Sequence, residues 1–168
     1  MRAKHILKIS LVAGLVATVS ALAMTATSSA AQDRWTDSFD YSSSAPCATF
    51  TNLWSGHADE RGMTTYDKAG RPVKDIVHQT GSELDWRSDT LASFSVLWSF
   101  TIVYDYASDT TTLNGNVDTA TSPGLGKLFH DVGTVAFTED GPVKVHGPHD
   151  VLAGGNQVYC DALAMLGA

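Results

Sequence analysis

Residues 92–106 form the most regular stretch of the sequence. Every second side chain is apolar or aromatic, and most of the side chains between are small and polar. The first set is Ala92, Phe94, Val96, Trp98, Phe100, Ile102, Tyr104 and Tyr106, and the second is Ser93, Ser95, Leu97, Ser99, Thr101, Val103 and Asp105. Because side chains on a strand point alternately to the two faces of a sheet, the pattern predicts a long strand with one apolar face. An apolar face of this size must be covered, so the chain is expected to be an all-β protein organised around this strand.

Turn-forming residues divide the rest of the chain into shorter segments. Further strands are predicted over 50–66, 73–86, 110–117, 134–138 and 143–146, with a short helix over 157–166. Residues 32–45 are expected to form a mobile polar lead-in, 110–117 an edge or solvated strand and 121–131 a long loop. Closing an antiparallel sheet removes its edges. The favoured fold is therefore a small antiparallel β-barrel with a short C-terminal helix, and a β-sandwich is the alternative.

The first 31 residues have the layout of a secretory signal peptide. Arg2, Lys4 and Lys8 come before or at the start of an apolar run, and small residues follow at Ser28–Ala31. The run is shorter than the roughly 20 apolar residues of a membrane span. We therefore expect cleavage near Ala31, secretion without a membrane anchor, and a single mature domain over 32–168.

The mature chain is strongly acidic. Its 8 Lys and Arg residues against 18 Asp and Glu residues give a net charge of about −10. This balance argues against nucleic acid or anionic lipid as a partner. No sequence motif indicates a cofactor, and the oligomeric state is left open.

Two cysteines lie near opposite ends of the mature chain, at Cys47 and Cys160. An isolated pair in an oxidising compartment is expected to form a disulfide bond. A redox or metal-binding role is the alternative, but the sequence has no C-x-x-C and no third sulfur ligand. His146 and His149 invite a metal interpretation, but their odd spacing and the Pro between them argue against it, so no metal site is predicted.

Several short motifs resemble those of a group of uncharacterised secreted actinobacterial proteins. They are Pro46-Cys47-Ala48, Tyr66-Asp67-Lys68-Ala69-Gly70-Arg71-Pro72-Val73, Val132-Gly133 opening a strand into Phe137, His146-Gly147-Pro148-His149-Asp150, and Tyr159-Cys160-Asp161-Ala162-Leu163. In outline the group is similar to the barrels of allene oxide cyclases, dirigent proteins and lipocalin-like carriers. The resemblance implies a barrel with a pocket, and it supplies no catalytic residue.

One polar constellation is a candidate for catalysis. His57, Asp59 and Arg61 alternate along one predicted strand, so they share a face. If the 67–72 turn pairs its two ends, Arg61 lies opposite His78, which joins the same face. A His–Asp group of this kind could carry out acid–base chemistry near neutral pH. The alternative is an ordinary solvent-facing surface.

The aromatic face of the central strand is the other candidate site. Phe94, Trp98, Phe100 and Tyr104 either fill the core or line a lumen that holds an apolar ligand. Three functions follow: binding of a small apolar ligand, a cyclase or isomerase reaction on the His/Asp/Arg face, or a surface interaction module. Binding without catalysis is the favoured interpretation.

Overall fold

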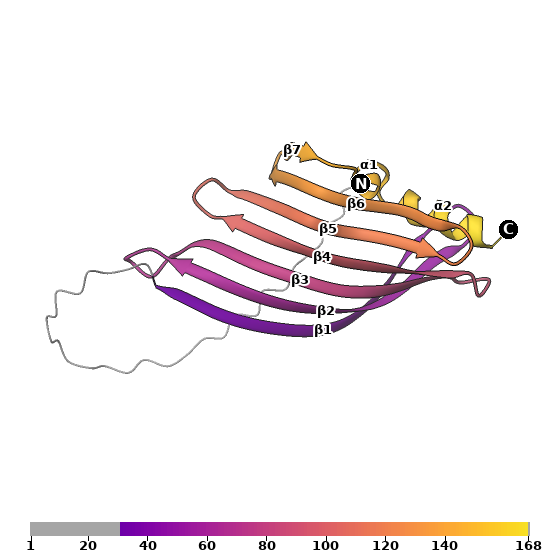
Figure 1. Ribbon diagram of the computed structural model, residues 1–168, viewed down its shortest axis with the longest axis horizontal. Helices are drawn as coiled ribbons and strands as arrows, with labels where there is room; N and C mark the ends of the chain where they lie inside the picture. The colour runs from indigo at the N-terminus through magenta and orange to yellow at the C-terminus, as the bar shows by residue number, and fades with distance from the viewer. Residues whose placement is uncertain (1–30, 168) are drawn as a thin grey trace, which may run out of the picture.

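The computed structural model describes residues 31–167, so all but the last residue of the predicted signal peptide lies outside the described residues. Seven strands and two helices follow one another along the chain (Figure 1). They are β1 (Gln32–Pro46), β2 (Thr51–Tyr66), β3 (Pro72–Arg87), β4 (Ser93–Asp105), β5 (Thr110–Ser122), β6 (Gly126–Thr138), β7 (Gly141–His146), α1 (Asp150–Gly154) and α2 (Asn156–Leu166). Each strand pairs antiparallel with the next, which confirms the predicted antiparallel β protein with a short C-terminal helix.

The strands form one open sheet, and the predicted barrel is not confirmed. In Figure 1, β1 and β7 lie at the two opposite edges, and the sheet order runs from β1 to β7 without a pairing between them. The two edges are poorly matched, because β1 has 15 residues and β7 has 6. A closed barrel needs edges of similar length to pair along its seam.

The predicted lead-in over 32–45 is wrong, because these residues form β1, paired with β2 along its whole length. Acids at Asp33 and Asp37 interrupt the apolar alternation of this segment, so its sequence reads as polar. Its aromatic residues are held by the neighbouring strand. A Cβ added at Gly62 would clash with the Trp35 ring, which shows that the ring lies directly over the glycine.

The predicted long loop over 121–131 is also wrong. Only Pro123–Leu125 turn the chain, and β5 and β6 pair on both sides of this turn. Gly124 and Gly126 have φ values of +84° and +77°, a conformation that suits glycine and lets the turn be tight. The segment predicted as an edge strand, 110–117, belongs to β5, which lies between β4 and β6.

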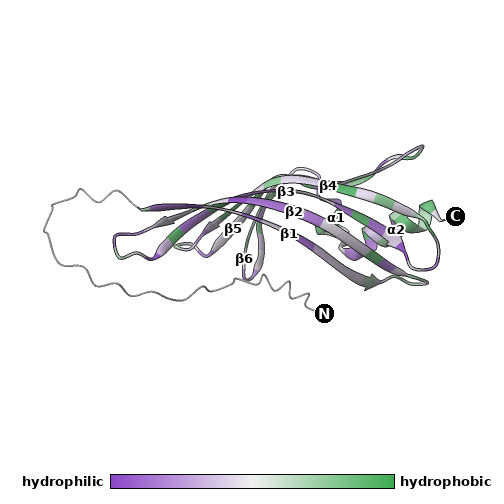
Figure 2. Ribbon diagram, turned by 90° about the horizontal axis from the view of Figure 1, so that it is seen from below, coloured by the Kyte–Doolittle hydropathy of each residue, from purple (hydrophilic) through white to green (hydrophobic). Residues whose placement is uncertain are grey.

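The sheet bends into a trough, and the helices lie inside one end of it (Figure 2). Helix α2 contacts β2, β3, β4 and β6, so it crosses the inner face. Residues directly opposite each other on paired strands share a face, so the register assigns each side chain to the inner or the outer face. Phe94, Val96 and Trp98 of β4 point inward, as the apolar alternation predicted.

The hydrophobic core lies where α2 packs on the inner face. Its buried members are Phe94, Val96, Ala120, Phe129, Ala162 and Leu163. The disulfide between Cys47 and Cys160 ties α2 to the connection between β1 and β2, which confirms the predicted bond. We call this region the covered half. The rest of the inner face has no element packed over it among residues 31–167, and we call it the open half.

Candidate functional site

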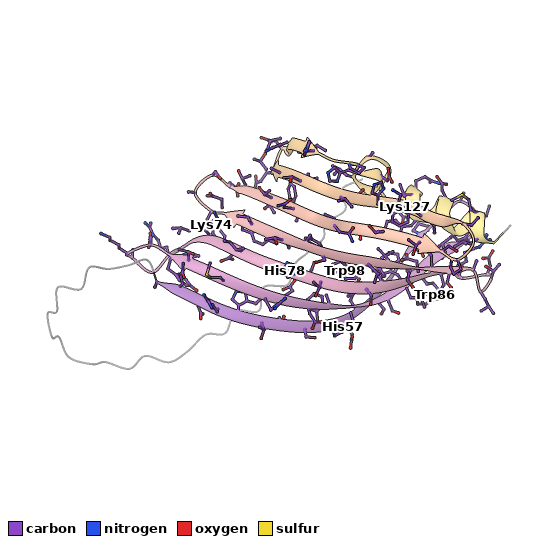
Figure 3. The ribbon with its side chains drawn as sticks, in the orientation of Figure 1. His57, Lys74, His78, Trp86, Trp98 and Lys127 are labelled. Atoms are coloured by element: carbon purple, nitrogen blue, oxygen red, sulfur yellow. A yellow bond between two sulfur atoms is a disulfide. The ribbon has the colours of Figure 1, made fainter. Side chains whose placement is uncertain are left out.

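The predicted catalytic set His57, Asp59, Arg61 and His78 lies on the outer face of the sheet. Arg61 is opposite His78, as expected, but not through the expected turn: Tyr66, not Asp67, pairs with Pro72, and a register shift between Thr65 and Tyr66 restores the pairing of Arg61 with His78. Figure 3 shows His57 and His78 over the middle of the sheet, away from the helices. Histidine 57, Asp59 and Arg61 are exposed and His78 is partly buried. The four residues therefore share a face, but that face is convex and encloses no substrate.

His57 is the centre of a small polar network with β1. Its Nδ1 lies 2.7 Å from Asp40 Oδ1, its Nε2 lies 3.3 Å from Ser38 Oγ, and its Nε2 also lies 3.5 Å from Asp59 Oδ1. The hydrogen bond with Asp40 raises the pKa of His57, and the charge of Asp59 adds to this effect. Opposite charge next to a histidine favours its protonated form.

The Ser38–His57–Asp40 contacts have the order of a nucleophile, a base and an orienting acid, but the surroundings do not suit acyl transfer. Such a reaction needs hydrogen-bond donors aimed at the developing oxyanion. The Ser38 amide instead donates to the carboxylate of Asp37 over 2.9 Å. The nearby carboxylate of Asp59 would also repel the oxyanion, so the network is best explained as an exposed ion-pair cluster. Shallow hollows flank it, and their lining is mostly Ser, Thr and acidic residues.

The predicted ligand-lining residues divide between the two halves of the inner face. Phe94 is 3% exposed and packs edge-on against Phe129, so it belongs to the core of the covered half. Phe100 and Tyr104 are only partly buried and lie in the open half. Trp98 lies at the boundary between the two halves. Its ring covers Gly81 and packs against the edge of the core, and its ring centroid lies 6.3 Å from that of Tyr41.

The open half is organised as three parallel rows that cross the sheet. The middle row is apolar and runs through Trp35, Gly62, Val77, Ile102, Leu113 and Val135. The row nearer the helices contains Asp37, Glu60, Gln79, Phe100, Gly115 and Gly133, and the far row contains Asp33, Thr64, Asp75, Tyr104, Thr111 and Phe137. An apolar strip is therefore bordered on both sides by carboxylates and aromatic rings.

Two glycines in the row nearer the helices leave the sheet surface beside Phe100 without side chains. Gly115 and Gly133 are directly opposite each other on β5 and β6, with φ values of +131° and +135°. No side chain rises from the sheet at these positions. The aromatic ring of Phe100 therefore borders a low part of the trough on its β5–β6 side.

Several acidic residues lie among the apolar residues of the inner face, and sequence reasoning missed them. Asp37 and Glu60 are opposite each other on β1 and β2, and Asp75 lies on β3 in the far row. Gln79 donates to Glu60 over 2.7 Å, and the Tyr106 hydroxyl donates to Asp75 over 2.6 Å. Burial raises the pKa of Tyr104, and the charges of Glu60 and Asp75 raise it further, so these groups lie close together. The sequence of β3 could have shown that these acids lie on the inner face. Asp75, Glu83 and Asp85 are separated from the apolar Val77 by even numbers of residues, so they point to the same side of the strand.

Three further carboxyl groups lie at the covered end. Asp85 is 0% exposed; its Oδ1 accepts a hydrogen bond from Asn52 over 2.8 Å, and its Oδ2 has no partner among the described residues. Burial raises the pKa of Asp85 to about 8, and nearby Glu83 contributes. Burial likewise raises the pKa of Asp118 to about 7, although Tyr159 donates to it over 3.1 Å. Glu83 lies beside Tyr41 and Asp85, and its own pKa is raised by burial.

The remaining sequence candidates have structural roles. His149 precedes α1, and Asp131 accepts hydrogen bonds from the Val151 and Leu152 amides at the start of that helix. His146 is exposed at the end of β7. Within residues 31–167 no group of three His, Cys, Asp or Glu side chains is arranged to hold a metal ion. No helix in the same range is long and apolar enough to cross a membrane.

Comparison with known proteins adds no relative, since no family model, no curated protein and no solved structure matches the chain. Any functional conclusion therefore rests on the geometry of the two faces.

Proposed function

We propose that this chain is a secreted binding protein that holds a small apolar molecule along the open half of its inner face. The observation that carries the proposal is the apolar row of the open half. The row continues the core face of the sheet past the end of α2. Neighbouring side chains bury Val77 and Val135, whereas Trp35, Ile102 and Leu113 are partly exposed. An apolar sheet face flanked by aromatic rings is the kind of surface that binds an apolar ligand.

The rings around this row lie in a position to contact a ligand. Phe39 is 40% exposed and Tyr106 is 50% exposed, and both border the open half. Phe100, Ile102 and Tyr104 of β4 are each partly exposed. The resemblance to carrier proteins implied a ligand site in the lumen of a closed barrel. In this open sheet, the trough lined by these rings takes the place of that lumen.

The cyclase or isomerase alternative has less support. Its residues His57, Asp59, Arg61 and His78 lie on the convex face, where water reaches three of the four. Acid–base chemistry gains most where water is excluded and charges are held in a low-dielectric site. The disulfide is compatible with an extracellular location, which is part of this proposal.

The proposal is tested with N-phenyl-1-naphthylamine, a neutral probe whose fluorescence rises in apolar surroundings. We expect saturable binding to the wild-type protein and about two- to tenfold weaker binding to Phe100→Ala, since an aromatic contact is worth about 0.5–1.5 kcal/mol. Leu97→Ala is the matched control, because Leu97 is an exposed apolar residue of the same strand on the outer face.

The control variant should bind the probe as the wild-type protein does. Circular dichroism of both variants should match the wild-type spectrum, which separates lost binding from lost structure. Absence of saturable binding to the wild-type protein, or an equal loss in both variants, would remove the open half as the site.

A further inference from the structure

We propose that the open half selects a cationic ligand, an apolar body that carries an amine or quaternary ammonium group, over neutral and anionic molecules of the same shape. This inference rests on the proposed function and adds the charge of the ligand. It follows from the distribution of charge between the two faces of the sheet.

The inner face is acidic along its whole length. Carboxylates occupy both rows that border the apolar strip, with Asp37 and Glu60 on one side and Asp33 and Asp75 on the other. Glu83, Asp85 and Asp118 continue the acidic residues beneath α2. Burial raises the pKa of each of these three groups, so the negative charge of the inner face is concentrated in the open half.

Basic side chains on the described strands lie on the outer face, with one exception. Arg34, Arg61, Lys74, Lys127 and Lys144 are all paired with outer-face residues. The exception is Arg87 at the covered end, whose guanidinium donates to both carboxylate oxygens of Asp89 and stacks on the Phe50 ring at 4.2 Å. The carboxylates of the open half therefore have no Lys or Arg beside them on that face.

Aromatic rings stand next to these carboxylates. Phe100 is in the row of Glu60, Tyr104 is in the row of Asp75, and Trp35 lies between the two rows. Ring faces attract cations, and the attraction grows when the cation is partly desolvated. Carboxylates and rings around one apolar strip complement a molecule that joins an apolar body to a positive charge. A metal ion fits less well, because the described residues bring together no set of ligands for one.

The test compares three probes that share a naphthylmethyl body. One carries a trimethylammonium group, the second the neutral tert-butyl group of the same shape, and the third a sulfonate. Binding is measured by isothermal titration calorimetry on the mature protein at low and at physiological salt. We expect the cation to bind at least tenfold more tightly than its neutral isostere, the sulfonate to bind most weakly, and the cation preference to shrink with added salt.

Two double variants with the same change in net charge locate the effect. Asp37→Asn/Glu60→Gln removes inner-face carboxylates, and Asp40→Asn/Asp59→Asn removes outer-face carboxylates from the same two strands. The inner variant should lose about tenfold in affinity for the cation and keep its affinity for the neutral isostere. The outer variant should change its cation affinity by less than about threefold.

The outcomes separate the two proposals. Equal affinity for the cation and the isostere, or equal losses in the two double variants, would overturn the cation preference and leave apolar binding standing. Failure of all three probes to bind would overturn the proposed function as well. A dimer in sedimentation velocity that excludes the probes would assign the open half to a second copy of the chain, and would also overturn the inference.

Discussion

The two halves of the inner face use the same strands in different ways. In the covered half, Leu163 and Ala162 of α2 close over Phe94 and Val96, and each of these residues is 3% exposed or less. In the open half, the next apolar residues of β4, Phe100 and Ile102, are only partly buried. One alternating strand therefore serves as core at one end and as accessible surface at the other. Alternation alone marks the apolar face of a strand, and the element packed on that face decides what it does.

The largest expected loss of stability comes from removing the disulfide bond that holds α2 in the covered half. Replacing both cysteines by serine opens a loop with a sequence separation of 113 residues. The chain-entropy model gives about 4–5 kcal/mol for a loop of this length. Urea denaturation at neutral pH measures the loss. A cost below about 1 kcal/mol would mean that packing alone holds α2 in place.

Truncating one residue in each half measures the contrast directly. Leu163 is 0% exposed, so Leu163→Ala should destabilise the protein by about 3–4 kcal/mol, through lost burial and a cavity. Ile102→Ala in the open half should cost about 1–2 kcal/mol, since part of its side chain already meets water. The two variants are compared by urea denaturation, and the m value of each should equal that of the wild-type protein. Equal costs would show that the open half is packed as tightly as the core.

The buried carboxyl groups predict a pH dependence specific to the covered half. The pKa of Asp85 is raised to about 8 from an ordinary value of 3.8, so the folded protein holds a proton that the unfolded chain releases between these pH values. The stability contributed by Asp85 is therefore present below about pH 4 and is lost as the pH rises toward about 8.

Replacement of this carboxyl should remove its share of the pH dependence. As the pH rises from 5 to 9, the free energy of unfolding of Asp85→Asn should increase relative to that of the wild type, by at most about 4 kcal/mol. Thermal or urea unfolding at several pH values measures the difference, with Asp59→Asn on the outer face as the control. A constant difference between wild type and Asp85→Asn would contradict the raised pKa.

The smallest effect concerns the outer face. The Asp40 hydrogen bond holds the pKa of His57 above its ordinary value of 6.5, and NMR titration of the imidazole should show this. Asp40→Asn should lower the His57 pKa toward its ordinary value and leave stability unchanged, because the pair is exposed. Ser38→Ala is the control and should leave the pKa in place. An unchanged pKa in Asp40→Asn would mean that the pair does not persist in solution.

The sequence alone predicted the parts of the fold that a single local signal determines. The alternation of β4, the terminal helix and the bond between the two cysteines each depend on one strand, one helix or one pair of residues. The pairing of Arg61 with His78 was expected from a turn that the structure closes differently, and a register shift between Thr65 and Tyr66 restores it. β1 was missed because acids interrupt its alternation and because its Trp35 and Tyr41 rings lie over glycines of another strand. The open sheet was also missed, since closure depends on how two distant edges match.

The candidate site was harder to predict for the same reason. Catalysis was assigned to His57 and its neighbours because titratable groups on one strand are visible in the sequence. Which face is concave depends on the position of α2, and no stretch of sequence states it. Asp37, Glu60 and Asp75 come together only through the register of three strands, so their shared face had to be seen in the structure.

The simple order of the strands has a consequence for how the chain folds. Every strand reaches its partner through a short turn, so the sheet can form by adding one hairpin after another, with little loop-closure entropy at each step. Helix α2 has nothing to dock on until β2, β3, β4 and β6 are aligned. We therefore expect the Cys47–Cys160 bond to form late in folding, after α2 has docked on the aligned strands. Reduction of this disulfide would be expected to release the C-terminal helix first and to disturb the sheet only afterwards.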